Sequence, residues 1–164
     1  MNYMALIKLL YLADRQSLIE TGAPITGDRL VVMPFGPVLS STLNSINMGE
    51  PLGGSRSDWY QYISEPDGYT VKAKTTGEFE TLSPYEKRVL DGIYAEFGKM
   101  DRWALVEYTH KLPEWSDPNG SSFPIDVEVI LRSAGRSDEE IEAISQEAES
   151  VWLIRSLGKT RSWS

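Results

Sequence analysis

Cysteine is absent from this 164-residue chain, and histidine occurs once, at His110. Without cysteine the protein has no disulfide framework, no thiolate nucleophile and no cysteine-ligated zinc site. A metal site would have to rely mainly on carboxylates, and the sequence shows neither a metal-ligand spacing nor a nucleophile elbow. We therefore expect a protein without metal, cofactor or catalytic centre.

A hydrophobic run long enough for a membrane helix is also lacking. The first twelve residues are largely apolar, but Lys8 interrupts them, and Asp14 and Arg15 follow. No small-residue cleavage pattern accompanies this segment, so it indicates neither a signal peptide nor a membrane span. Together with the lack of cysteine, this predicts a cytoplasmic protein without a membrane partner.

Positive charge is scarce. The sequence has 16 lysines and arginines against 24 aspartates and glutamates, which gives a formal net charge of -8 and a pI near 4.7. Such a protein repels phosphate backbones, so the composition argues against nucleic-acid binding. Hydrophobic residues make up 41% of the chain, which at this length indicates one folded domain with a single core.

Hydrophobic periodicity and capping signals predict an α+β fold with about six helices packed around a small three-stranded antiparallel sheet. Two capping-box patterns, which start at Ser83 and Ser137, mark helix starts with particular clarity. The helices are expected over residues 3–20, 37–48, 84–97, 102–111, 126–134 and 138–157, and Gly22 is expected to close the first of them in the left-handed conformation.

The sheet is expected from a hairpin in the middle of the chain. Two runs of aromatic and β-branched residues, 59–64 and 69–74, flank a turn sequence at residues 65–68. Because an isolated hairpin is marginally stable, we expect residues 29–33 to join it as a third strand.

The first of these runs carries three large aromatic residues, Trp59, Tyr60 and Tyr62. Successive side chains of a strand point to opposite faces, so these residues cannot all point inward. Two interpretations stay open. Either some of them form an exposed binding surface, or the neighbouring helices bury them.

Residues 6–40 read LIKLLYLADRQSLIETGAPITGDRLVVMPFGPVLS, a hydrophobic helix followed by a loop and a turn that glycines and prolines define. Residues 110–115 read HKLPEW. This order resembles the SocA-like antitoxin family (the Panacea domain), whose members have a KLLYLADR helix, a PITGDR loop, a PxGPV turn and an HKLPEW-like motif. The resemblance spans about residues 3–144.

The resemblance implies a non-enzymatic antitoxin that binds and neutralises a protein toxin encoded by a neighbouring gene. The SocA branch implies a second mechanism, in which the protein is an adaptor that delivers its toxin to an ATP-dependent (AAA+) protease. We expect the domain to cover residues 1–158 and a flexible tail to cover residues 159–164. Association into a homo-oligomer is left open.

Candidate residues fall into two groups. Charged members of the family motif are expected to form ion pairs between the first helix and the GDR loop. The motif residues expected to be structural are Lys8, Tyr11, Asp14, Arg15, Gly27, Pro34, Gly36, Pro37, His110, Pro113 and Trp115. The residues expected to contact the toxin are Asp28, Arg29, Trp59, Tyr60, Tyr62, Tyr69 and Lys72.

The sequence argues against two other functions. A small hydrolase would centre on His110, Glu107 and Glu114, but the sequence offers no recognisable nucleophile for it. A DNA-binding autorepressor conflicts with the acidic composition. The acidic run over residues 138–149 is expected to form a solvated helix face, which would also steer a basic partner.

Overall fold

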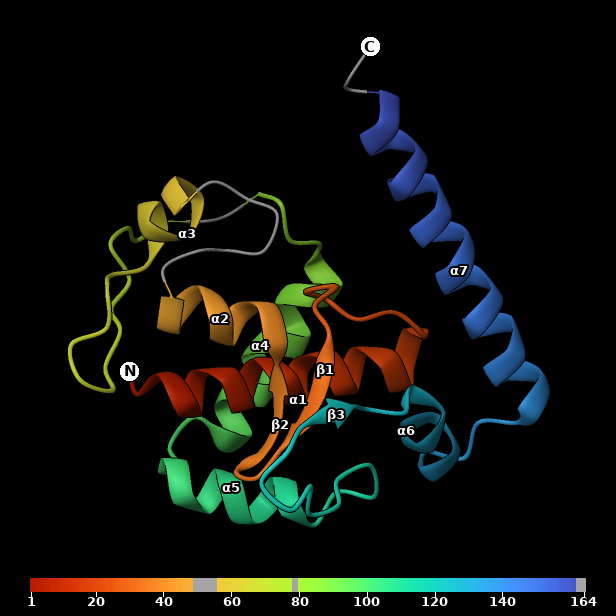
Figure 1. Ribbon diagram of the computed structural model, residues 1–164, viewed down its shortest axis with the longest axis horizontal. Helices are drawn as coiled ribbons and strands as arrows, with labels where there is room; N and C mark the ends of the chain where they lie inside the picture. Colours follow the sequence, from red (N-terminus) through yellow and green to blue (C-terminus); the bar gives the residue numbers. More distant parts are fainter. Residues whose placement is uncertain (49–55, 78–79, 162–164) are drawn as a thin grey trace.

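The computed structural model describes residues 1–48, 56–77 and 80–161, and these residues form seven helices and one three-stranded sheet (Figure 1). The predicted α+β class and antiparallel sheet are confirmed, with one helix more than expected. The elements are α1 (Tyr3–Thr21), β1 (Leu30–Met33), β2 (Gly36–Leu39), α2 (Ser40–Met48), α3 (Arg56–Tyr62), α4 (Pro84–Phe97), α5 (Arg102–His110), β3 (Phe123–Pro124), α6 (Val127–Ser133) and α7 (Asp138–Arg161).

Helix α1 lies at the centre of the fold, where it contacts α2, α4, α5, α6 and β2 (Figure 1). The side chain of Asn2 caps its start by accepting hydrogen bonds from two backbone N–H groups. Gly22 closes the helix in the left-handed conformation, with φ of 79°, as the sequence predicts. Tyr11 and Leu12 of α1 are buried in the main core cluster with Leu105 and other apolar residues of the surrounding elements.

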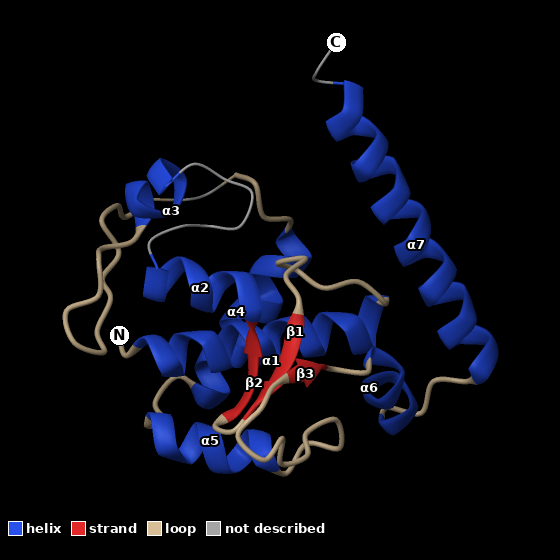
Figure 2. Cartoon of the chain, in the orientation of Figure 1, coloured by secondary structure: helices blue, strands red, loops and turns tan. Residues whose placement is uncertain are grey.

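The three strands lie across α1 in the order β2-β1-β3, and both pairs are antiparallel (Figure 2). In the β1–β2 hairpin, Val31 pairs with Val38. Pro37 belongs to β2, so the predicted helix start at Pro37 is wrong, and α2 begins at Ser40. A proline is tolerated here because β2 is the edge strand of the described sheet, where its missing N–H removes no ladder hydrogen bond.

The predicted hairpin of strands 59–64 and 69–74 is also wrong, and the predicted third strand, residues 30–33 in the structure, pairs with β2 and β3 instead. Trp59 is in helix α3, and only isolated bridges, such as that between Ile63 and Ala73, retain the chain reversal. Helical geometry places residues four apart on the same face. Trp59 and Ile63 accordingly both pack against the smaller core cluster, which contains Val71. Strand preference depends strongly on packing context, and here the packing favours a helix.

Local capping signals predicted the later helices correctly. The Ser83 box at the start of α4 and the Ser137 box at the start of α7 both form. Helix α7, however, continues past Gly158 to Arg161, beyond the expected end at residue 157. Residues 159–161 are therefore helical, and the rest of the predicted tail, residues 162–164, lies outside the described residues. No helix in the described part of the chain is long and apolar enough to cross a membrane.

Replacing Gly22 by alanine should lower the free energy of unfolding by about 1–2 kcal/mol, because φ is positive there. An added Cβ would also lie 2.8 Å from Cγ1 of Ile144 on α7. Gly92→Ala is the matched control, since Gly92 is inside α4 with open space around it. We expect this control to gain up to about 1 kcal/mol. Urea unfolding of both variants measures the difference, and equal effects would contradict the account of the helix end.

Candidate functional site

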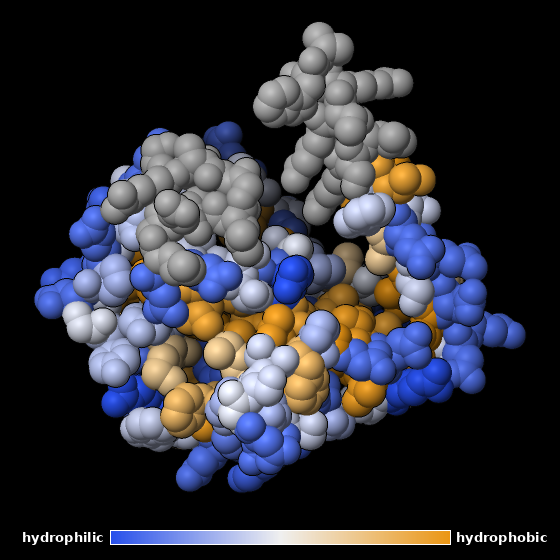
Figure 3. All heavy atoms as spheres, viewed as in Figure 1, coloured by the Kyte–Doolittle hydropathy of each residue, from blue (hydrophilic) through white to orange (hydrophobic). Residues whose placement is uncertain are grey.

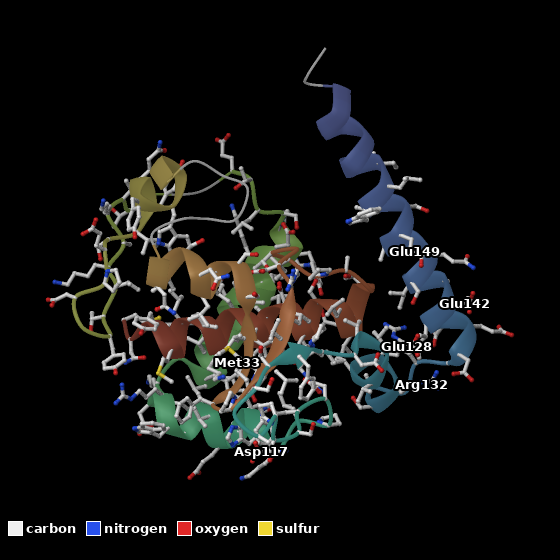
Figure 4. All side chains as sticks on the ribbon, viewed as in Figure 1. Met33, Asp117, Glu128, Arg132, Glu142 and Glu149 are labelled. Carbon is white, nitrogen blue, oxygen red and sulfur yellow. The ribbon has the colours of Figure 1, made fainter. Side chains whose placement is uncertain are left out.

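Side chains at the end of α5 and in the segment just after it bind the turn between β1 and β2. The indole Nε1 of Trp115 donates a hydrogen bond to the carbonyl of Met33 at 3.0 Å. The Nε2 atom of His110 lies 3.1 Å from the carbonyl of Pro34. The rings of His110 and Trp115 stack with their centroids 3.8 Å apart. Met33, whose carbonyl accepts the bond from Trp115, is labelled near the centre of the view in Figure 4. Together these contacts fix the path of the exposed turn. Pro113 is in the bend between these two residues.

A buried lysine holds the other end of the turn. The ammonium group of Lys8 on α1 donates to the carbonyl of Pro37 at 2.8 Å, and the residue is 2% exposed. Burial lowers the pKa of Lys8 from 10.5 to about 7. Gly36 has φ of 96°, and an added Cβ would lie 2.7 Å from Nζ of Lys8 and 2.6 Å from Oγ1 of Thr109. Only glycine fits beside this lysine.

A second buried contact ties α1 to the HKLPEW segment. The hydroxyl of Tyr11 donates to Oε1 of Glu114 at 2.7 Å, and Nε of Arg15 lies 2.6 Å from the same oxygen. Burial raises the pKa of Tyr11, and the Glu114 carboxylate adds to this effect. The predicted partner of Arg15 in the GDR loop is therefore wrong, because this guanidinium pairs with a residue after α5.

Asp14 binds the PITGDR loop through its backbone rather than through a basic side chain. Its Oδ1 atom accepts hydrogen bonds from the N–H groups of Ile25 and Thr26, both at 2.9 Å, and its Oδ2 accepts one from the Thr26 hydroxyl. Burial raises the pKa of Asp14, although these hydrogen bonds act in the opposite direction. Gly27 follows with φ of 68°, which suits a glycine in this tight loop.

Asp28, which is expected to contact a partner, caps α2. Its carboxylate accepts hydrogen bonds from the backbone N–H groups of Ser41 at 2.9 Å and Thr42 at 2.8 Å. Its half-burial by itself raises the pKa, but these hydrogen bonds outweigh it and lower the pKa of Asp28 below its ordinary value. The neighbouring Arg29 is exposed.

The turn carries an exposed aromatic residue, Phe35, which is part of a connected set of rings. Phe35 packs edge-on against Trp103 on α5, with ring centroids 6.0 Å apart. The guanidinium of Arg102 lies over the rings of Trp103, at 5.0 Å, and Tyr69, at 5.1 Å. Tyr69 in turn contacts Tyr3, at 5.8 Å. We call these five residues the aromatic surface.

The aromatic surface has the composition of a protein-binding hot spot, because tryptophan, tyrosine and arginine dominate such sites. Phe35 is 56% exposed, Trp103 51% and Tyr69 56%. A cavity of about 180 Å³ opens beside Phe35, with Tyr3 and Leu43 in its walls and Lys8 among its lining residues. The surface therefore combines projecting rings with a recess that an apolar side chain could enter.

The predicted contact residues do not gather in one place. Tyr69 belongs to the aromatic surface. Trp59 is half-buried and lines a different hollow, of about 270 Å³, together with Asp28. Its indole Nε1 is buried without a hydrogen-bond partner in the described structure. On α3, Tyr60 is half-buried and Tyr62 is 46% exposed, and Lys72 is exposed in the segment that follows.

Sequence reasoning missed four residues of the aromatic surface, namely Tyr3, Phe35, Arg102 and Trp103. A signal for Phe35 was available, because an aromatic residue inside a Pro-Phe-Gly-Pro turn is beyond the reach of either strand's buried face. No comparable signal connects Phe35 with α5, since that contact depends on how α5 packs beneath the turn (Figure 1). Among the described residues, no cluster of three or more histidine, aspartate or glutamate side chains could hold a metal ion.

Lys8→Met should remove a pH dependence from the stability. Between about pH 7 and 10.5 the unfolded chain binds more protons at this position than the folded one, so the free energy of unfolding rises with pH. The slope from this group is at most about 1.4 kcal/mol per pH unit, and it vanishes below pH 7, where both states are protonated. Urea unfolding across this range measures the slope. The exposed Lys87→Met variant should keep it, and a Lys8→Met variant with the wild-type slope would contradict the prediction.

Comparison with known proteins places these motifs in a family. The family model described as "Antitoxin SocA-like, Panacea domain" matches residues 6–116, which is more than half of the chain. Searches of curated proteins and of solved structures gave no match. The matched segment contains most of α1, the β1–β2 turn, α5 and the HKLPEW motif, whereas β3, α6 and α7 lie beyond it. The chain belongs to the SocA-like antitoxin family, the Panacea domain family.

Proposed function

We propose that this chain is a cytoplasmic antitoxin that neutralises a protein toxin encoded by a neighbouring gene, through direct binding and without catalysis. The observation that carries the proposal is the family match over residues 6–116, which contain four of the five residues of the aromatic surface. Tyr3 is the fifth and lies three positions before the first matched residue. We further propose that the aromatic surface contacts the toxin.

The turn supports this assignment because its shape does not depend on a partner. Side chains bind three of its carbonyls, those of Met33, Pro34 and Pro37. These side chains come from α1, from the end of α5 and from the segment after α5. A surface that is already ordered loses little conformational entropy on binding, so more of its contact energy appears as affinity. Large rings with few rotatable bonds add to this advantage.

Two of the candidate catalytic groups of the hydrolase alternative, Glu114 and His110, already have structural partners. The carboxylate of Glu114 is engaged by Tyr11 and Arg15. The ring of His110 lies against the carbonyl of Pro34 and is stacked on Trp115. His110 therefore holds the turn and Glu114 binds α1, and this arrangement favours a binding role over general acid–base catalysis.

Co-expression with the neighbouring gene product tests the function. If the chain blocks the toxin directly, it should restore growth, co-purify with the toxin in a stable complex and leave the toxin's half-life unchanged. A shortened half-life that depends on an ATP-dependent protease would support the adaptor mechanism instead. Growth inhibition that persists despite well-expressed, folded protein would contradict the antitoxin proposal.

Substitution at the aromatic surface tests where the toxin binds. Trp103→Ala should weaken toxin binding by roughly 30-fold or more, equivalent to about 2 kcal/mol, and Phe35→Ala should have a similar or smaller effect. The matched control is Tyr94→Ala on α4, because Tyr94 is 58% exposed and outside the aromatic surface. Isothermal titration gives the affinities, and thermal unfolding confirms that each variant folds.

Equal affinities for the wild type, Trp103→Ala and Phe35→Ala would exclude the aromatic surface as the toxin contact. The antitoxin proposal would stand in that case, because co-expression tests it independently.

A further inference from the structure

Arg102 is the only charged residue of the aromatic surface, and its guanidinium has no anionic partner in the described part of the chain. Its contacts are with the rings of Trp103, at 5.0 Å, and Tyr69, at 5.1 Å. Neither ring offers an oxygen to its N–H groups, and no hydrogen bond or ion pair of this guanidinium is present among residues 1–48, 56–77 and 80–161. Three other arginines do pair with carboxylates, namely Arg15, Arg132 and Arg136.

The two rings hold this guanidinium in place before any partner arrives. Arg102 is half-buried at the first position of α5, and Tyr69 reaches it from the segment after α3. A guanidinium is planar and carries five N–H donors in a fixed fork, so one that is already held in place loses little freedom when it forms hydrogen bonds. Arg102 is therefore a prepared but unused set of donors.

The aromatic surface and the recess beside Phe35 lack acidic groups, although the chain as a whole has 24 acidic residues and 16 basic ones. None of the described residues that line the recess is acidic, and one of them, Lys8, is basic. Lys8 donates to the carbonyl of Pro37 and has no carboxylate partner in the described structure. Over the end of the molecule where α1 and α5 begin, Figure 3 shows hydrophobic and hydrophilic residues side by side. The local charge is opposite in sign to that of the chain, which favours an acidic partner.

A hollow of about 470 Å³ gives access to Arg102, which lines it together with Trp103 and Asn2. The one acidic residue among its described lining residues is Asp101. The Oδ1 atom of Asp101 accepts hydrogen bonds from the backbone N–H groups of Trp103, at 2.8 Å, and Ala104, at 2.9 Å. This carboxylate caps α5 and forms no ion pair with Arg102. The hollow therefore leaves room for another acidic side chain to reach the guanidinium.

A partner that covers the aromatic surface also buries the charge of Arg102. Binding hot spots exclude water, and a guanidinium that loses its water without gaining a counter-charge strongly opposes binding. The described residues of this chain supply no carboxylate to Arg102, so the counter-charge has to come from the partner. A carboxylate suits this place, because its two oxygens accept two parallel N–H bonds from one guanidinium.

We propose that an aspartate or glutamate side chain of the toxin binds Arg102. This inference rests on the proposed function, in which the aromatic surface contacts the toxin, and it adds the chemistry that the toxin presents there. Apolar groups next to the carboxylate pack against the exposed rings of Phe35 and Trp103. A toxin that lacks the carboxylate leaves Arg102 buried and unpaired, so this ion pair selects between toxins as well as adding affinity.

Isothermal titration of the neighbouring gene product with Arg102 variants tests the ion pair. Arg102→Gln removes the charge and should weaken toxin binding by roughly 30-fold or more. Arg102→Lys keeps the charge but loses the fork, and it should weaken binding by about tenfold. The matched control is Arg88→Gln, because Arg88 is exposed on α4 and lies outside the aromatic surface. This control should change the affinity by less than about twofold, and thermal unfolding confirms that each variant folds.

Double-mutant cycles identify the carboxylate. Each aspartate and glutamate of the toxin is replaced in turn by asparagine or glutamine, and each toxin variant is titrated with the wild type and with Arg102→Gln. One replacement should weaken binding to the wild type strongly but add little to the loss in Arg102→Gln, which gives a coupling of about tenfold or more. Arg102→Glu, combined with a lysine at that toxin position, should recover part of the affinity.

Wild-type affinity in Arg102→Gln would overturn this inference. So would a loss of affinity that couples to no acidic residue of the toxin, because Arg102 would then only support the two rings. If Trp103→Ala still weakens binding and co-expression still restores growth, either result excludes the acidic contact and leaves the proposed function standing. Sedimentation equilibrium without toxin covers the remaining source of carboxylates. A wild-type dimer that Arg102→Gln converts to a monomer would assign the contact to a second copy of the chain and overturn the proposal.

Discussion

Helix α1 is buried on most of its faces and yet carries polar side chains, and this burial determines the rest of the structure. A polar group removed from water without a hydrogen bond costs several kcal/mol, so each of these side chains must find a partner within the protein. Lys8 donates a hydrogen bond to a carbonyl of the β1–β2 turn, and Tyr11 donates one to Glu114 after α5. Asp14 accepts hydrogen bonds from two N–H groups of the loop that follows α1. One buried helix thereby positions three separate segments of the chain.

The proposed toxin contact is a consequence of these hydrogen bonds. Side chains of α1 on one side, and of the end of α5 and the segment after it on the other, bind the carbonyls of the β1–β2 turn. The turn therefore projects Phe35 in a defined direction, against Trp103. Most of the family motif therefore supports the surface without belonging to it. His110 illustrates the point, because its ring is one of the groups that hold the turn. The motif identifies the family, and the neighbouring exposed rings are the better candidates for binding.

Predictions from the sequence were right where a feature depends on neighbouring residues. The left-handed helix end at Gly22 and the capping boxes at Ser83 and Ser137 involve hydrogen bonds that span a few residues, so their signals are complete in the local sequence. Predictions failed where packing decides. The aromatic run that starts at Trp59 is compatible with a strand or a helix, and Pro37 can start a helix or occupy an edge strand.

The sequence by itself determined the family, the α+β class and the ends of most helices, because glycines, prolines and caps act through local geometry. Only the tertiary structure decided which strands pair, where the buried charges find partners and which rings meet at the surface. Arg15 and Glu114 are 99 positions apart, and nothing in the residues around either one indicates that the two form a pair. The same holds for Phe35 and Trp103. Such contacts depend on the folded path of the whole chain, because burial joins residues that have no local preference for each other.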